Sequence, residues 1–383
     1  MIQRTQLEQR ICIALGRSRI VALLGPRQCG KTTLARVIAK SMVPLTYFDL
    51  ENRMDLNKLA NPMMVLGALK GYIVLDEIQQ RPRIFSDLRV LADRDPLPAR
   101  FLILGSASPD IIRGCSESLA GRVEFVFMSG FDLSETLPES WPSLWWRGGF
   151  PPAFLAASDE DARVWQDNFI RTFLERDLRN MGINIAPVAL HRLWQMHAHS
   201  HAQVFKASEL GRSLAESYMT VKRHTDLLTG SFLIRQLPPW YENLGKRQVK
   251  SPKLYVRDSG LLHALLQIQD RDTLLGNPKV GASWEGFALE QVLRLVGDQN
   301  AYFWAAQSGA EIDLFLLHQG RRLGVEFKFS ETPKTTRSMR EAMKFLKLEW
   351  LYVVHPGSES FPMDENIWAL SIKNIGLILT GVK

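Results

Sequence analysis

The chain has 383 residues, a formal net charge of +7 at pH 7 and an apolar fraction of 46%. One hydrophobic core rarely organises so long a chain, so two or three folded domains are expected. No uncharged apolar run reaches membrane-spanning length and the first residues lack a secretory pattern, so we expect a cytoplasmic protein with no membrane part. The widely spaced Cys12, Cys29 and Cys115 argue against a disulfide scaffold or a zinc ribbon. The basic balance is compatible with a polyanionic partner.

The first motif is a phosphate-binding loop between a predicted strand and a predicted helix. The apolar run Arg19–Leu24 is followed by GPRQCGKTT, which matches G-x-x-x-x-G-K-[ST], and a helical pattern then runs over Lys31–Lys40. In such a loop the backbone N–H groups approach the phosphates, Lys31 carries positive charge to them, and the Thr32 hydroxyl ligates Mg²⁺. The sequence therefore predicts ATP and Mg²⁺ as ligands. The candidate nucleotide-binding residues are Gly25, Pro26, Arg27, Gln28, Cys29, Gly30, Lys31, Thr32 and Thr33.

A pair of acids follows the next strongly apolar run. Tyr72–Leu75 is typical of a buried parallel strand, and Asp76 and Glu77 come directly after it. A carboxylate at the tip of such a strand can hold Mg²⁺ beside Thr32, and a second one can orient or deprotonate the attacking water. Asp76 is therefore a predicted metal ligand and Glu77 a predicted catalytic residue. Together they favour hydrolysis.

Two further residues are candidates for contact with the γ-phosphate. The run RFLILGSAS ends in Gly105 and Ser106, and a polar side chain there is placed to sense the phosphate. Arg122 follows SLAG and is a candidate for stabilising the transferring charge in its own or a neighbouring subunit. A solvated surface role for Arg122 is an equal alternative. Action across an interface would make the protein a homo-oligomer, possibly a ring.

With these motifs in order, the chain resembles the prokaryotic AAA-type ATPases that carry a C-terminal domain of unknown function with a restriction-endonuclease-like core. The segments that carry the resemblance are GPRQCGKTT, GYIVLDEIQ, FLILGSAS, SLAGR, RGGFPPAF, FLERDL, KSPKLYVRDSGLLHALL, WEGFALEQVL, EIDLFL and VEFK. The resemblance implies an AAA+ P-loop ATPase with Walker A and Walker B motifs. One departure is that Ser106, rather than asparagine, occupies the sensor position, which puts that role in doubt.

The middle of the chain contains a connector and a predicted winged helix. WPSLWWRGGFPPAF is typical of an irregular, packed connector, although its tryptophans and Arg147 could also stack on bases. Four histidines between His191 and His201 lack nearby cysteines and favour a packed helix over a metal site. Further on, Ala207–Leu214 is predicted as a second helix and Ser217 as the start of a third, followed by a wing near Pro238. The candidate DNA-binding residues are Thr220, Lys222, Arg223 and His224, together with a basic cluster of Lys246, Arg247, Lys250 and Lys253. A protein-docking use of the same fold remains open.

The C-terminal segment GAEIDLFLLHQGRRLGVEFKFS predicts a β-hairpin with its turn at Gln319–Gly320. Strict alternation would put Glu311 and Asp313 on one face, with Ile312, Leu314 and Leu316 on the other. The pairing then places Asp313 opposite Glu326, near Lys328.

Two neighbouring carboxylates and a lysine suit Mg²⁺, as in the D…E-x-K arrangement of PD-(D/E)xK nucleases. Asp313 and Glu326 are therefore candidate metal ligands, Lys328 is a candidate catalytic residue, and either Glu285 or Glu290 is a candidate for a further acid. The alternative is a salt-bridged hairpin face in which Lys328 pairs with Glu311 or Glu326, in a domain that binds without cleaving.

The expected fold class is α/β and multidomain, an AAA+-like ATPase followed by a winged helix and a restriction-endonuclease-like domain. The expected segments are residues 1–130, a helical connector over 131–185, the winged helix over 186–262 and the nuclease-like domain over 263–383. The favoured function is an ATPase that acts on DNA, including branched recombination or repair intermediates. The alternatives are a regulatory ATPase switch that binds protein partners, and an ATP-dependent nuclease.

Overall fold

The computed structural model describes residues 2–106, 109–180, 183, 185–241, 251–306 and 309–381. The chain divides into two compact units, Met1–Gly130 with Asp226–Phe232, and Phe131–Thr225 with Leu233–Lys383. Each unit is described by itself. In the described ranges, no helix is long and apolar enough to cross a membrane.

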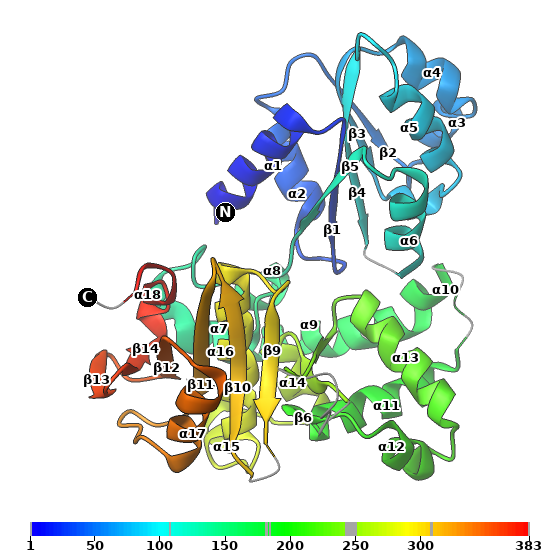
Figure 1. Ribbon diagram of the computed structural model, residues 1–383. Helices are drawn as coiled ribbons and strands as arrows, with labels where there is room; N and C mark the ends of the chain where they lie inside the picture. Colours follow the sequence, from blue (N-terminus) through cyan, green and yellow to red (C-terminus); the bar gives the residue numbers. More distant parts are fainter. Residues whose placement is uncertain are drawn as a thin grey trace. The chain divides into compact units, whose positions relative to one another are not determined.

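The first unit is built on a five-stranded parallel sheet with the strand order β2-β3-β4-β1-β5 (Figure 1). The strands are β1 (Ile20–Gly25), β2 (Leu45–Asp49), β3 (Gly71–Asp76), β4 (Ala99–Ser106) and β5 (Val123–Phe127). β1 is buried along its whole length, as expected for a central parallel strand covered on both faces. The apolar runs that the sequence assigned to strands are β1, β3 and β4.

Helices lie on both sides of this sheet, with α1 and α2 on one side and α5 and α6 on the other (Figure 1). The helices are α1 (Thr5–Arg17), α2 (Lys31–Ala39), α3 (Arg53–Lys58), α4 (Pro62–Ala68), η1 (Ile78–Gln80), α5 (Ile84–Ala92) and α6 (Pro109–Ser118). The core on the α5 side joins Ala22 and Leu24 of β1 to Ile73 and Leu75 of β3 and to Leu88 of α5. This packing fixes the strand ends that carry the nucleotide motifs.

The second unit begins with a helical segment in which tryptophans are packed inside. Its elements are η2 (Pro138–Ser140), α7 (Trp141–Arg147), α8 (Pro151–Phe154), α9 (Asp159–Thr172), the π-helical turn η3 (Phe173–Asp177) and α10 (Leu178–Asn180). Trp145 is 5% exposed, its indole N–H donates to Ser283 Oγ at 3.0 Å, and its ring meets Trp284 edge-on. These contacts support the packed-connector interpretation rather than base stacking.

Three helices and a small antiparallel sheet follow. They are α11 (Pro187–His199), α12 (Ala207–Leu214) and α13 (Tyr218–Gly230), with β6 (Gln203–Val204), β7 (Ile234–Leu237) and β8 (Lys253–Val256) in the order β6-β8-β7. α12 has the bounds that the sequence predicted, and Ser217 directly precedes α13 and accepts from the Thr220 N–H at 3.0 Å. The residues Lys246, Arg247 and Lys250 lie outside the described part of the chain.

The rest of the second unit surrounds a six-stranded mixed sheet in the order β13-β14-β12-β11-β10-β9. Its elements are α14 (Ser259–Leu265), α15 (Arg271–Leu275), α16 (Val280–Val296), β9 (Ala301–Ala305), β10 (Glu311–His318), β11 (Arg321–Phe327), α17 (Arg337–Leu346), β12 (Trp350–His355), β13 (Phe361–Asp364), β14 (Ile367–Ser371), η4 (Ile372–Asn374) and α18 (Leu377–Thr380). The segment boundary predicted between residues 262 and 263 is misplaced. It falls inside α14, whose residues are all buried, whereas domain boundaries fall in exposed linkers.

The predicted β10–β11 hairpin is present with the predicted register, because His318 pairs with Arg321 and Leu314 with Val325. The predicted strict alternation along β10 is wrong. Between Ile312 and Phe315 the pairing with β9 shifts by one residue, and these two side chains share one core with α17. The bulge explains the difference, since an extra residue changes which face the following side chains occupy. Asp313 lies within this bulge.

Candidate functional site

The nucleotide motifs meet at the carboxyl edge of the five-stranded sheet. Gly25 at the end of β1 pairs with Ser106 at the end of β4, and Asp49 at the end of β2 pairs with Asp76 at the end of β3. β4 lies between β1 and β3. Four strands therefore end at the same edge, which is where open parallel sheets place their ligands.

The phosphate loop has the tight backbone that its glycines predict. Gly30 is the N-cap of α2 and has φ 100°, in the left-handed region that favours glycine. A Cβ on Gly25 would lie 2.0 Å from the carbonyl oxygen of Met128, so only glycine fits there. Arg4 further fixes the loop, because its guanidinium donates to the carbonyls of Cys29 and Ser129 at 3.2 and 3.0 Å.

Lys31 begins α2 and is 6% exposed. Its ammonium donates to the carbonyl oxygens of Gly25 and Pro26 at 3.0 and 2.7 Å. The side chain thus folds back over the loop where phosphates would lie. Thr32 follows it on the first turn of α2 and is partly exposed.

Asp76 is held in place by two hydrogen bonds. Its Oδ2 accepts from the Tyr47 hydroxyl at 2.5 Å and its Oδ1 accepts from the Glu77 N–H at 2.9 Å. The side chain is 2% exposed. Burial and the bond to Asp76 raise the pKa of Tyr47 above its usual range, so the phenol keeps its proton and remains a donor.

Glu77 adopts a left-handed backbone conformation, with φ 55° and ψ 48°, and caps η1. Its carboxylate accepts a short hydrogen bond from Gln79 Nε2. Burial raises the pKa of Glu77, while the charge of Lys31 and the bond from Gln79 oppose that rise. A half-buried carboxylate with a raised pKa is suited to accept a proton from water.

Ser106 contributes the clearest sign of a missing polar partner. The residue is 2% exposed, and its hydroxyl has no hydrogen-bond partner among the described residues. A buried hydroxyl without a partner costs free energy unless a ligand or water completes it. With the ammonium of Lys31, the tight loop and the carboxylates of Asp76 and Glu77, this edge fits a triphosphate and its magnesium ion.

Arg122 does not lie at this edge. It precedes β5, and its carbonyl oxygen accepts from the N–H of Ile20, the first residue of β1. Since β1 spans six residues, Arg122 is about 17 Å from the carboxyl edge at roughly 3.3 Å per residue. Its guanidinium bonds Asp93 at 2.6 and 2.7 Å. Contact with a nucleotide in the same subunit is therefore excluded, and contact with a neighbouring subunit's nucleotide remains a prediction.

The four predicted DNA-binding residues lie on α13 but differ in access. Lys222 and Arg223 are exposed. His224 is 7% exposed and burial lowers its pKa, so its predicted contact with DNA does not fit this arrangement. The Thr220 hydroxyl lies 2.9 Å from Ser217 Oγ and serves the start of the helix.

The histidines of the middle segment have separate structural roles. His197 Nε2 lies 2.9 Å from Thr225 Oγ1, and His201 Nδ1 accepts from the Val256 N–H at 3.0 Å. Burial lowers the pKa of each to about 3, so both rings are neutral. They pack within the unit, as the sequence favoured.

The C-terminal carboxylates gather around an internal lysine. Lys253, on β8, is 6% exposed and places its ammonium 3.3 Å from Asp313 and 3.6 Å from Glu285. Tyr255, two residues on, donates its hydroxyl to Glu285 at 2.7 Å. Burial lowers the pKa of Lys253, but the charges of the two acids outweigh that effect and raise this pKa above its usual value. Lys253 is therefore a buried counter-ion and not part of a basic surface.

Lys328 and Glu326 complete this cluster as an ion pair at 2.7 Å, which is the salt-bridged alternative from the sequence. Burial and the charge of Asp313 raise the pKa of Glu285 and of Glu326 to about 8. Among the residues with described positions, no three Asp, Glu, His or Cys side chains are arranged to hold a metal ion. Lys253 stands beside Asp313 and Lys328 beside Glu326, so ammonium groups supply positive charge next to both acids, and a metal site at Asp313 and Glu326 stays a prediction.

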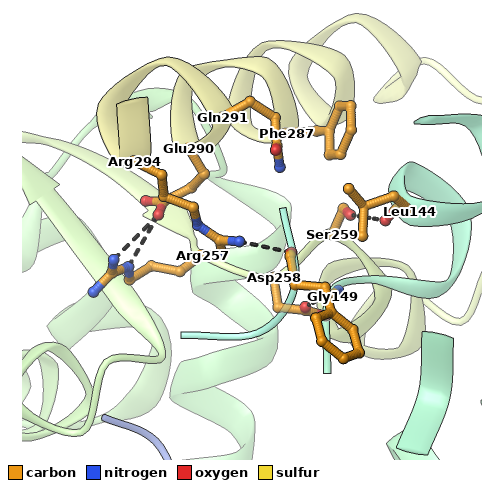
Figure 2. Close-up of a pocket in the computed structure, with 10 residues that line it drawn as sticks. Leu144, Gly149, Arg257, Asp258, Ser259, Phe287, Glu290, Gln291 and Arg294 are labelled. Carbon is orange, nitrogen blue, oxygen red and sulfur yellow. Dashed lines mark hydrogen bonds and ion pairs between the residues drawn. The ribbon is translucent and has the colours of Figure 1, made fainter. Parts of the chain in front are cut away.

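Of the two candidates for the remaining acid, Glu285 joins the cluster and Glu290 does not. Figure 2 shows Glu290 on α16 facing Arg257, in a pocket that Arg294 also lines. Glu290 is 1% exposed and pairs with Arg257 at 3.2 Å and with Arg235 at a shorter distance. Burial raises the pKa of Glu290, but the charges of the two arginines outweigh that effect and hold this pKa below its usual range. Glu290 is a structural ion-pair partner, which corrects its candidacy for the nuclease-like site.

Several residues that complete these sites were not predicted from the sequence. Gln79 follows the acid pair by two positions and was visible in DEIQQ, but nothing marked its side chain as a partner of Glu77. Tyr47 and Arg4 carry no local signal. Lys253 was visible only as a basic residue, because its partner Asp313 lies 60 positions further along the chain.

Protein-family models match three consecutive segments of the chain. An AAA domain covers residues 17–137, a domain of unknown function (DUF8612) covers 138–272, and a second domain of unknown function (DUF4143) covers 280–375. The first match contains the phosphate loop, the acid pair, Ser106 and Arg122. The last contains Glu285, Asp313 and Glu326.

Two mycobacterial proteins are similar along nearly the whole chain. The uncharacterized proteins Rv2008c of Mycobacterium tuberculosis and Mb2031c of Mycobacterium bovis are each 48% identical over 375 residues, which is 98% of this chain and 85% of theirs. Two solved structures that resemble the chain are much more distant. The Walker-type ATPase PABY2304 of Pyrococcus abyssi is 13% identical with a TM-score of 0.46, covering 70% of this chain and 96% of its own. A RuvB of Thermotoga maritima is 15% identical with a TM-score of 0.30, covering 62% and 90%.

At these TM-scores the structural likenesses carry no argument about the site. The assignment to a family rests on the matched AAA domain, the matched DUF4143 domain and the 48% identity to the mycobacterial proteins over nearly the whole chain. The resemblance drawn from the motifs is confirmed. The chain belongs to the family of AAA-type ATPases that carry a C-terminal domain of unknown function, DUF4143.

Proposed function

We propose that the chain binds ATP with Mg²⁺ and hydrolyses it at the carboxyl edge of the first unit's sheet. The observation that carries the proposal is the buried hydroxyl of Ser106, which lacks a partner among the described residues beside the phosphate loop. A bound phosphate oxygen or an ordered water would supply that partner. The family supports nucleotide binding in general, and the arrangement of charges supports hydrolysis in particular.

Each residue has a separate task in this proposal. Lys31 leaves the loop carbonyls and neutralises phosphate charge, while Thr32 and Asp76 would hold the magnesium ion. The metal supplies charge neutralisation on the phosphate oxygens. Glu77 orients the attacking water and takes its proton, as its raised pKa permits.

Steady-state hydrolysis of ATP by purified variants tests this proposal. Lys31→Ala should lose nucleotide affinity and turnover, whereas Glu77→Gln should keep affinity and lose turnover. Matched controls are Lys40→Ala, an exposed lysine at the end of α2, and Glu117→Gln, an exposed acid on α6, and both should behave as wild type. Turnover by Lys31→Ala equal to wild type would remove the site assignment.

We further propose that the ATPase acts on DNA through the segment of α11, α12, α13 and the β6-β8-β7 sheet. This element order supports a winged helix with α13 as its recognition helix. Lys222 and Arg223 are exposed on α13 and can reach phosphates. The excess of positive charge over the whole chain favours the same partner. The structure of the DNA substrate, branched or linear, is part of the test.

Binding and ATPase assays with single-stranded, duplex, forked and four-way DNA separate the alternatives. DNA action predicts salt-sensitive affinity that falls in Lys222→Ala/Arg223→Ala but not in Lys344→Ala, a lysine of α17 remote in sequence. DNA that neither binds nor stimulates hydrolysis would favour the protein-partner switch. Strand cleavage lost in Asp313→Asn would favour the nuclease, which the internal pairing of Lys253 with Asp313 argues against.

A further inference from the structure

Gln79 joins the two parts of the nucleotide edge that carry the candidate catalytic residues. Its Nε2 donates to the carboxylate of Glu77, and its Oε1 accepts from the backbone N–H of Ser106 at 3.3 Å. One carboxamide thus connects the acid after β3 to the last residue of β4. A carboxamide offers both a donor and an acceptor, and this geometry uses both.

The chain around this amide leaves room for it. Gly105, next to Ser106, has no side chain, and a Cβ there would lie 3.1 Å from Gln79 Oε1 and 2.9 Å from Ile78 Cγ2. Gly105 therefore provides the space that the amide and the η1 turn occupy.

The backbone of Glu77 also depends on its surroundings. A residue with a Cβ rarely adopts φ 55°, and such conformations persist where neighbouring contacts over-determine them. Here the Glu77 N–H donates to Asp76 Oδ1 and the Glu77 carbonyl accepts from the Gln80 N–H at 3.0 Å. These bonds fix the main chain, and Gln79 fixes the side chain.

The hydroxyl of Ser106 lies at the other end of this connection. The backbone N–H of Ser106 donates to Gln79 Oε1. The hydroxyl of the same residue is buried and has no hydrogen-bond partner among the described residues. A γ-phosphate or an attacking water at this position would contact Ser106, which is hydrogen-bonded to Gln79, and Gln79 in turn bonds Glu77. The connection therefore links occupancy of the phosphate site to the position of the general base.

We infer that Gln79 is a positioning residue for ATP hydrolysis, which holds the Glu77 carboxylate in line with the end of β4. The inference rests on the proposed ATPase function. In the reaction the water oxygen bonds to the γ-phosphorus, its proton passes to Glu77, and the bond from the γ-phosphorus to the β–γ bridging oxygen breaks to leave ADP and phosphate. Gln79 touches neither water nor phosphate and acts only through Glu77.

The test compares Gln79→Met, which keeps the side-chain length but removes the amide, with Gln80→Met, its exposed neighbour on η1. Gln79→Met should lower kcat about 10- to 100-fold, because misplacing a general base slows the chemical step by about that factor. KM for ATP should change less than about 3-fold. Gln80→Met should match wild type in both measurements.

A second variant, Gln79→Ala, guards against misfolding caused by the methionine and should show the same loss of kcat with retained binding of an ATP analogue. If wild type and Gln80→Met turn over ATP, Glu77→Gln is inactive, and both Gln79 variants keep the wild-type kcat, the inference is overturned while the proposed function stands. If wild type itself shows no turnover, the proposed function falls and the inference falls with it.

Discussion

The buried acid cluster of the second unit predicts that Glu285→Gln stabilises the protein at neutral and alkaline pH. Glu285 is buried beside Asp313, and burial with that charge raises its pKa from 4.5 to about 8 despite Lys253. Glutamine has the same shape, keeps an oxygen for the Tyr255 hydroxyl, and carries no charge to desolvate. The gain should therefore appear only where the wild-type carboxyl would otherwise be ionised in the unfolded chain.

The sign and size of the stabilisation by Glu285→Gln follow from proton linkage. The folded protein keeps the Glu285 proton to higher pH than the unfolded chain does, so its stability falls as pH rises from about 4.5 to about 8. At about 1.36 kcal/mol per pH unit, and with the repulsion shared among the acids of the cluster, glutamine should add about 2 kcal/mol at pH 7.5. At pH 5 the gain should fall below about 0.7 kcal/mol.

Urea unfolding followed by tryptophan fluorescence measures this effect selectively. All 10 tryptophans lie at or after Trp141, so the signal reports the second unit. The same substitution on the same helix, Glu290→Gln, serves as a control of opposite sign, because Glu290 is paired with Arg235 and Arg257. A Glu285→Gln variant less stable than wild type at pH 7.5, or equally stabilised at pH 5, would refute the reasoning.

Three further outcomes follow from the same contacts. Lys253→Met should cost about 3–5 kcal/mol at pH 7.5 by leaving Asp313 buried without its cation, as measured in the same urea experiment. If Arg122 acts on a neighbouring subunit's nucleotide, mixing inactive Lys31→Ala with inactive Arg122→Ala should restore measurable ATP turnover, and no recovery at any ratio would exclude that role. Ser217→Ala should cost about 1 kcal/mol in unfolding free energy by removing the acceptor at the start of α13.

The nucleotide edge could be predicted from the sequence because its signals are local. Each motif follows its own apolar run, and parallel strands deliver their carboxyl ends to one edge regardless of strand order. The phosphate loop, Asp76, Glu77 and Ser106 therefore meet as expected. What escaped prediction was the side-chain network, since the bond from Tyr47 to Asp76 depends on which strands become neighbours.

The C-terminal site was predicted less completely, for two physical reasons. A single extra residue in β10 changed the faces of the strand, and bulges of this kind leave no clear mark in an apolar sequence. The cation beside Asp313 comes from β8, far away in the sequence, so spacing could not reveal it. The hairpin turn and the pairing of Lys328 with Glu326 were accessible because they are local.

Calorimetric titration of the full chain with a non-hydrolysable ATP analogue and Mg²⁺ tests the central claim most directly. Wild type and Lys40→Ala should bind the nucleotide with equal affinity, and Lys31→Ala should bind it at least about tenfold more weakly, because it lacks the ammonium now held by Gly25 and Pro26. Absence of binding by wild type, or equal binding by Lys31→Ala, would contradict the account.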